Sequence, residues 1–312
     1  MKRSADLPSL GKLATEQVNP ASADLDLKPS LELAQIINAE DAKVAAAVSK
    51  ALPQIAQAMD WIAGALRHGG RLIYVGAGTS GRIAALDAAE CPPTFNTNPK
   101  SIQFVIAGGV RALAGAVEAN EDSAKLGERE LAKKKPGKKD LVIGIAASGR
   151  TPFTVAAVEY ARRKGARTVA VVCNTGSPLE KAAELAIVAE VGPEVVSGST
   201  RMKAGTAQKM ILNMLSTGAM TQLGYVYGNL MVNVHLKNEK LVERGVGILQ
   251  KVAGISREEA LLAIKRAGNR VPVALVMLKA GVTRPQAEKA LKTAKGHVRG
   301  AIAASVKSRL LL

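Results

Sequence analysis

Residue types that support metal, thiol or stacking chemistry are scarce in this chain. Aromatic residues make up only 3% of its 312 residues, so bases or glycans are not expected to be held on aromatic stacking platforms. The three histidines, His68, His235 and His297, are scattered, and no Cys/His spacing typical of a metal site is present. This scarcity also removes the usual nucleophile–histidine arrangements. If the protein is an enzyme, we therefore expect carboxylates to move protons, and we expect no metal.

Disulfide, membrane and export signals are missing from the sequence as well. The two cysteines, Cys91 and Cys173, give no disulfide framework. No apolar run approaches the ~18 residues that a membrane-spanning helix needs. The N-terminal MKRSADLPSL has a charged start but no apolar segment of the signal-peptide kind. These features predict a reducing cytoplasm as the location and no membrane partner.

Negative charge is in short supply, which leaves a formal net charge of +17. From Lys237 to the end there are 16 Lys and Arg against 5 Asp and Glu, so much of the excess lies in the last quarter. A basic surface can bind nucleic acid. It can also be a solvated face of alanine-rich helices that attracts anionic metabolites. We favour the second interpretation, with nucleic acid an unexpected partner, because no aromatic or recognition-helix pattern accompanies the charge.

Alternating strand and helix patterns dominate the middle of the chain. Continuous rather than alternating hydrophobicity in the strand-like runs predicts strands buried on both faces, as in a parallel sheet covered by helices. We expect an α/β fold with a doubly wound, mostly parallel five-stranded sheet. The strands are expected at 71–75, 102–107, 141–146, 168–172 and 185–189, with helices around 80–89, 111–133, 152–164, 177–183 and 203–223.

Helical patterns flank this core on both sides. Residues 1–28 are polar and predict an extended arm, and helices follow from Ser30 to Arg67 with a break or fresh start at Pro53. Near the end, the stretch at 253–257 recurs 27 residues later at 280–284, and each copy opens with a capping box. We expect two helical hairpins there. The predicted division is 1–67 for the arm and helices, 68–236 for the core and 237–312 for a small helical domain.

A glycine-rich loop follows the first strand as Gly76-Ala77-Gly78-Thr79-Ser80-Gly81. A helix N-terminus there favours an anion, and the spacing fits the dinucleotide fingerprint. That fingerprint also needs a carboxylate at the end of the second strand, where this chain has Ala107-Gly108-Gly109. The hydroxyls of Thr79 and Ser80 suit the terminal oxygens of a phosphomonoester better. We expect the following helix to end at Glu90-Cys91-Pro92-Pro93.

Two further hydroxyl-rich loops strengthen the phosphate interpretation. The third strand ends in Ala147-Ser148-Gly149-Arg150-Thr151-Pro152, and the segment from Ser197 to Lys203 contains Ser199 and precedes a long helix. Each loop alone is ordinary turn chemistry. Because parallel strands end at one edge of a sheet, three such loops together favour a phosphorylated small molecule.

Carboxylates near these loops are the candidate proton carriers. Glu90 stands at the predicted end of the helix that leaves the first loop, and Glu118, Glu121 and Asp122 form a second group. Two structural interpretations compete for that group. Asp122 or Asn120 would cap a helix, and Glu118 would lie on a solvated face.

Four motifs carry a resemblance to a known family. GAGTSGRIAALDAAECPPTF, IAASGRTPF, GPEVVSGSTRMKAGTAQK and GNLMVNV closely resemble the N-acetylmuramic acid 6-phosphate etherases, which have a sugar-isomerase (SIS) domain and are related to the glucokinase regulatory protein. The resemblance covers nearly the whole chain. It implies an SIS fold, a homodimer and no cofactor. It also implies cleavage of a D-lactyl ether, by elimination and then addition of water, to give N-acetylglucosamine 6-phosphate and D-lactate.

The resemblance also implies roles for single residues. Glu90 matches the family's proton donor and Glu121 its second active-site carboxylate. Thr79, Ser80 and Ser148 would hold the 6-phosphate, as would Ser199, and Lys240 resembles a lysine that related proteins bring to the sugar phosphate. The alternatives are a sugar-phosphate-sensing regulator and an aldose–ketose phosphate isomerase, because SIS domains occur in both.

Overall fold

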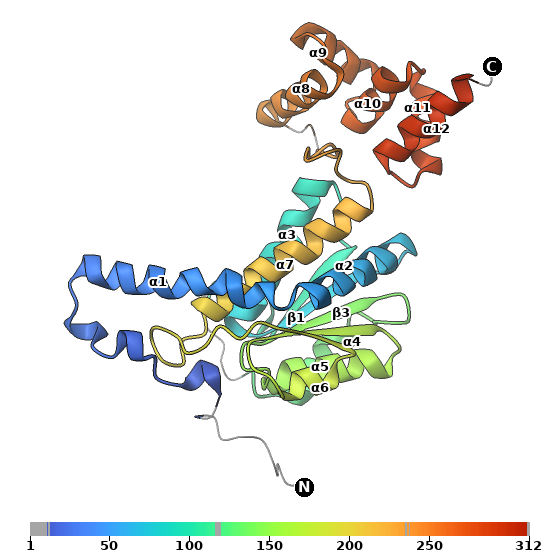
Figure 1. Cartoon of the computed structure of the whole chain (residues 1–312). Helices are drawn as coiled ribbons and strands as arrows, with labels where there is room; N and C mark the ends of the chain where they lie inside the picture. The colour runs from blue at the N-terminus through green and yellow to red at the C-terminus, as the bar shows by residue number, and fades with distance from the viewer. Residues whose placement is uncertain (1–10, 12, 116–119, 235, 237, 311–312) are drawn as a thin grey trace. The chain divides into compact units, whose positions relative to one another are not determined.

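The computed structural model describes residues 11, 13–115, 120–234, 236 and 238–310 (Figure 1). The candidate carboxylate Glu118 and the histidine His235 lie outside the described residues. The chain divides into two compact units. The first comprises Met1–Ala88 and Lys100–Ser216, and the second comprises Ala89–Pro99 and Thr217–Leu312. Each unit is described separately below.

A five-stranded sheet with every strand parallel forms the centre of the first unit, which confirms the predicted fold class. The strand order is β2-β1-β3-β4-β5, with Leu72 of β1 opposite Ile102 of β2 and Leu141 of β3. The residues of β1 and β3 are all buried, as their unbroken apolar runs predict. The strands span β1 (Leu72–Gly76), β2 (Ile102–Ile106), β3 (Leu141–Ile145), β4 (Arg167–Val172) and β5 (Leu185–Val188).

Helices cover both faces of this sheet (Figure 1). On one face, Ile73, Val75 and Val142 pack against Leu131 of α4 and Phe153 of α5. On the other face, α2 packs against β1, β3 and β5. This arrangement is the expected doubly wound sheet. The helices that begin in this unit are α1 (Ser30–Ser49), α2 (Leu52–Arg67), α3 (Gly78–Phe95), α4 (Ala124–Ala132), α5 (Pro152–Arg163), α6 (Pro178–Ala182) and α7 (Lys203–Gln222).

The helix expected over 111–133 is wrong in its first half. A short 3₁₀ helix covers Gly109–Leu113, and the α-helix α4 begins only at Ala124. Its N-cap is Ser123, whose side chain accepts a hydrogen bond from the amide of Leu126 at 3.2 Å. The cap is therefore Ser123 rather than Asp122 or Asn120. Gly115 and the polar run before Ser123 favour turns over helix, although the spacing of the apolar residues continues.

The predicted end of α3 at Glu90-Cys91-Pro92-Pro93 is also wrong. The helix continues through both prolines to Phe95. Proline removes an N–H donor but has a helical φ, so a last turn still closes when a later amide bonds across it. Here the amide of Asn96 donates to the carbonyl of Pro92 at 2.9 Å, and Asn96 ends the helix with a φ of +56°.

In its described residues, the predicted extended arm before α1 instead forms short 3₁₀ turns at Ala14–Glu16, Pro20–Ser22 and Leu25–Leu27. It is bound to the segment that precedes α7. The side chain of Asn19 donates to the carbonyl of Pro193 at 3.2 Å, and the hydroxyl of Ser22 donates to the carbonyl of Val195 at 2.8 Å. The predicted break or fresh start at Pro53 is confirmed, because α1 ends at Ser49 and α2 begins at Leu52, with Pro53 in its first turn.

The C-terminal part of the second unit is helical and has its own apolar core. Both predicted capping boxes are present, at Ser256 with Glu259 and at Thr283 with Gln286. The domain boundaries given above remain predictions. Nowhere in the described part of the chain is a helix long and apolar enough to cross a bilayer. The helices here are α8 (Glu239–Ala253), α9 (Arg257–Arg266), α10 (Val271–Ala280), α11 (Arg284–Thr293) and α12 (Val298–Leu310).

Candidate active site

The carboxyl ends of β1 and β3 mark the point where the chain changes direction across the sheet. From β1 the chain crosses to β2 on one side, whereas β3 leads to β4 on the other. Open parallel sheets bind ligands in the crevice outside such a switch point. The loops at 77–81 and 147–152 leave these two neighbouring strands. The sheet order thus brings two of the three predicted phosphate loops to one place.

The first loop passes directly into helix α3, which begins at Gly78. Thr79 and Ser80 lie in its first turn, where backbone N–H groups have no partner within the helix and favour an anion. A side chain at Gly81 would collide with Ile106, because its Cβ would lie 2.5 Å from Cγ1 of that residue. Glycine at this position lets the start of α3 approach β2 closely. Local geometry therefore supports the predicted role of Thr79 and Ser80 in binding an anion.

The predicted carboxylate Glu121 lies against the start of this helix. A Cβ at Gly78 would lie 3.0 Å from Oε1 of Glu121. The φ of Gly78 is +51°, which favours glycine there on backbone grounds too. The carbonyl of Glu121 accepts a hydrogen bond from the amide of Phe153 at 3.0 Å. Glu121 is thus held between the start of α3 and the start of α5, next to two of the predicted loops.

The second loop is shaped by Gly149. Its φ is +67°, and a Cβ there would lie 2.3 Å from the hydroxyl oxygen of Ser177. Next to it, the hydroxyl of half-buried Ser148 accepts a hydrogen bond from the amide of Arg150 at 3.2 Å. Ser148 therefore keeps its own proton to donate to a ligand oxygen.

The third loop differs because a carboxylate of the protein already binds the amides at the N-terminus of the helix that follows it. The two oxygens of buried Glu194 accept hydrogen bonds from the amides of Lys203 and Ala204, each at 2.9 Å. Burial raises the pKa of Glu194, and these amides oppose the shift. The first turn of α7 is thereby used internally, so Ser199 would contribute to a phosphate site only through its hydroxyl.

This third loop nevertheless reaches the first. A Cβ at Gly205 in the first turn of α7 would lie 3.5 Å from Cγ2 of Thr79 and 3.6 Å from the carbonyl oxygen of Thr200. The residues that follow Ser199 therefore lie beside Thr79.

A buried ion pair between two helices that are far apart in the sequence fixes the start of α7. Nζ of Lys203 lies 2.6 Å from Oε2 of Glu40 on α1, and both side chains are almost fully buried. Burial opposes ionisation of Glu40, but hydrogen bonds from Lys203, Lys43 and Asn19 outweigh it and lower its pKa to about 2. No role for Glu40, Glu194 or Lys203 was predicted from the sequence. The position of Glu194 shortly before a long helix is a sequence signal for its role as a helix-capping carboxylate. No such sequence signal marks Glu40.

The remaining predicted site residues, Glu90 and Lys240, belong to the second unit. Glu90 is exposed on α3 and is followed by buried Cys91. Lys240 is exposed in the first turn of α8, where the side chain of Asn238 caps the helix by accepting from the amide of Leu241 at 2.9 Å. Their joint action with the loops of the first unit stays a prediction. Within the described ranges, no group of His, Cys, Asp and Glu could hold a metal ion.

The parallel sheet and two overlapping family models place the chain in the class of SIS-domain proteins. Two sequence-family models match this chain. The family model of the glucokinase regulatory protein N-terminal SIS domain matches residues 54–162, and the family model of the SIS domain matches residues 132–218. Among solved structures, a phosphoheptose isomerase from Francisella tularensis has a TM-score of 0.50 at 18% identity, over 62% of this chain and all of that one. This likeness concerns the fold alone.

Curated relatives resolve the family within this class. An N-acetylmuramic acid 6-phosphate etherase from Photorhabdus laumondii is 50% identical over 95% of this chain and 98% of its own length. Relatives of the same name from Aeromonas hydrophila and Bacillus licheniformis are 50% and 47% identical over 93% and 96% of this chain, and over 97% and 98% of their own lengths. The chain belongs to the N-acetylmuramic acid 6-phosphate etherase family.

Proposed function

We propose that this protein cleaves the D-lactyl ether of N-acetylmuramic acid 6-phosphate and releases N-acetylglucosamine 6-phosphate and D-lactate. The observation that carries the proposal is the 50% identity to a named etherase over nearly the full length of both chains. The position of Glu121 beside the start of α3 supports it, because a carboxylate next to the proposed phosphate loop would lie near the sugar bound there. The reaction belongs to the recycling of cell-wall amino sugars.

Binding of the phosphate comes first in this proposal. The amides in the first turn of α3, with Thr79 and Ser80, would accept the 6-phosphate, and Ser148 would donate to it from the neighbouring loop. Ser199 and Lys240 are further proposed contacts through a hydroxyl and an ammonium group. Several hydrogen bonds to one terminal phosphate would hold the sugar in a fixed orientation.

Elimination across C2 and C3 follows in the open-chain sugar. The aldehyde acidifies the C2 proton, so a carboxylate base can remove it while the C3–O bond breaks and the lactyl oxygen takes a proton. We assign proton donation to Glu90, which leaves Glu121 as the proposed base. Water then adds at C3 of the unsaturated aldehyde, and its other proton returns to C2. The balance is one water consumed per ether cleaved, and no cofactor is needed.

The substrate incubated in deuterated water tests this reaction. We expect D-lactate together with deuterium at C2 of N-acetylglucosamine 6-phosphate. Glu90→Gln and Glu121→Gln should each lower the turnover number by at least about a hundredfold, with an unchanged circular dichroism spectrum. Glu159→Gln, on an exposed face of α5, is the matched control and should keep wild-type turnover. Lactate without deuterium would contradict elimination, and an isomerised sugar without lactate would indicate an aldose–ketose isomerase.

A homodimer is the proposed assembly, and it bears on which chain supplies each carboxylate. Mixing the inactive Glu90→Gln and Glu121→Gln chains tests this directly. If Glu90 of one chain acts with Glu121 of another, the mixed dimer contains one intact pair and regains activity. Sedimentation of the wild-type chain as a monomer at assay concentration would refute the dimer. The cytoplasm is the proposed location, and recovery of the protein outside the cell membrane on fractionation would contradict it.

A further inference from the structure

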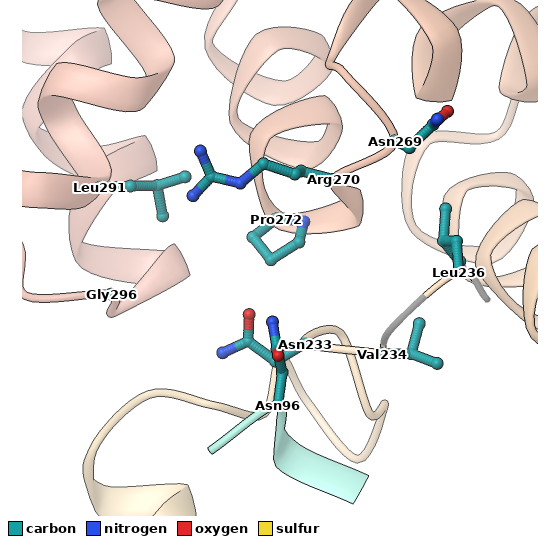
Figure 2. A pocket seen from close by; sticks show the side chains of 9 residues that line it. All are labelled: Asn96, Asn233, Val234, Leu236, Asn269, Arg270, Pro272, Leu291 and Gly296. Atoms are coloured by element: carbon teal, nitrogen blue, oxygen red, sulfur yellow. The ribbon is translucent and has the colours of Figure 1, made fainter. Parts of the chain in front are cut away.

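The second unit contains a pocket of about 320 Å³ that the proposed reaction does not use (Figure 2). Its lining combines Asn96, just after α3, with residues 233, 234 and 236 and with parts of the α9–α12 region. A volume near the lower end of the range for small-molecule sites suits a molecule the size of a monosaccharide. The lining residues include none of those assigned above to catalysis or phosphate binding.

The lining of the pocket mixes polar and apolar side chains (Figure 2). The carboxamides of Asn96 and Asn233 lie together and point toward Pro272 (Figure 2). Each carboxamide can donate and accept hydrogen bonds, as a hydroxylated ligand requires. Leu236 and Leu291 supply apolar lining on the remaining walls. This mixture is typical of sites that hold the polar edge and the apolar face of a small ring.

A single guanidinium gives the pocket its charge. Arg270 lines it, and no carboxylate does among the described residues. Arg270 forms an ion pair with Glu288, whose Oε1 lies 3.5 Å from Nη1 of Arg270 and accepts a hydrogen bond at 3.0 Å from Nε of Arg284. Two guanidinium groups thus share one carboxylate, which leaves one positive charge in excess. An oxyanion would balance that charge through a bidentate contact.

We propose that this pocket binds a monosaccharide-sized anion. Its phosphate or carboxylate group contacts Arg270, and its hydroxyls contact Asn96 and Asn233. A ligand so placed connects the end of α3 to the helices that carry Arg270. Because Glu90 lies on α3 only six residues before Asn96, which directly follows that helix, occupancy of the pocket would restrain the helix end next to this proposed proton donor.

Titration of the full-length protein, labelled with ¹⁵N in asparagine, tests the proposal. The probes are glucose, glucuronate and glucose 6-phosphate, which share one ring and differ in charge. Asn96→Gly and Asn233→Ala identify the two side-chain amide signals, and glycine tolerates the positive φ at position 96. We expect these signals to shift with glucuronate, glucose 6-phosphate or both, and not with glucose. The responding probe identifies the anionic group.

Charge variants show whether the shifts come from the pocket. Arg270→Gln should weaken binding at least about tenfold, the effect of losing a charge-assisted hydrogen bond. Arg266→Gln removes the same charge from an exposed position on α9 and should leave binding unchanged. Equal weakening by both variants, a response to glucose equal to that of the anions, or no shift with either anion would overturn the proposal. Loss of the shifts in Ser80→Ala would also overturn it, because the signals would then report the phosphate loop.

Discussion

Removing the buried carboxylate of Glu40 should destabilise the first unit strongly. Glu40 and Lys203 form a 2.6 Å ion pair, with side-chain exposures of 4% and 2%. Glu40→Gln leaves the ammonium of Lys203 buried without this counter-charge, a change that costs about 3–5 kcal/mol in buried pairs. The lowered pKa of Glu40 gives a similar estimate of the loss in the free energy of unfolding. A fall from 4.5 to about 2, at ~1.4 kcal/mol per unit, corresponds to about 3 kcal/mol.

Urea denaturation at pH 7 measures this loss. Trp61 of α2 stacks under the guanidinium of Arg167, so its fluorescence reports unfolding of the first unit. We expect the lower end of the range, about 3 kcal/mol, because Glu194 also lies near the ammonium of Lys203. The exposed pair of Lys28 and Glu32 provides the control, and Glu32→Gln should cost less than about 1 kcal/mol.

Two further measurements separate a lost ion pair from a packing defect. The double variant Glu40→Gln, Lys203→Met removes both charges and should recover most of the loss. The contribution of Glu40 also depends on pH. Because its pKa is lowered on folding, its stabilisation is complete above about pH 4.5 and is lost as the pH falls towards 2. The difference between wild type and Glu40→Gln should therefore shrink in acid. A double variant as unstable as Glu40→Gln, or a difference independent of pH, would refute the reasoning.

Two other predictions concern single contacts in the first unit, both measured by urea denaturation. Gly149→Ala should cost about 3 kcal/mol, because it adds a collision with Ser177 to the strain of a left-handed backbone. Gly176 has a similar φ but open space around it, so Gly176→Ala should cost about 1 kcal/mol. Equal losses in the two variants would contradict the collision. Tyr74→Phe removes a 2.8 Å hydrogen bond to buried Asp87 and should cost about 2 kcal/mol at pH 7. Burial raises the pKa of Asp87, so this cost should fall as acid protonates the carboxyl; a loss that grows in acid, or one matched by Tyr160→Phe, would exclude this explanation.

The sequence predicts the sheet well because its signal is local. Unbroken apolar runs such as Leu141–Ile145 leave few alternatives to a buried strand, and each of the five predicted strands is present within two residues of its expected bounds. Capping boxes are equally local, and both are found. Errors arose where local signals compete. Apolar spacing continues through Gly115 and Ser123, although these residues favour a turn and a helix cap. At the end of α3, Pro92-Pro93 indicated that the helix stops there, but it ends only at Asn96.

The site is predictable to the extent that its residues sit on local motifs. Thr79 and Ser80 follow a strand and begin a helix, and Ser148 follows the adjacent strand. Contacts between distant segments leave no such pattern. Nothing periodic connects Glu40 to Lys203, which are separated by 163 positions. The hydrogen bonds between Glu194 and the first turn of α7 are only partly predictable, because a carboxylate shortly before a long helix is the one local signal for them.

The arm before α1 has a consequence for how the chain acquires its structure. Asn19 binds Pro193 and Thr15 binds Asn174, contacts that span 174 and 159 positions. During synthesis, the arm and Glu40 emerge long before their partners, and the contacts with Pro193 and Lys203 can form only after all five strands have been synthesised. Closing such large loops is slow, because the entropy is lost before any contact compensates for it. The part of the arm around Asn19 is thus among the last to be fixed, and the segment before α7 that it binds takes its final shape only then.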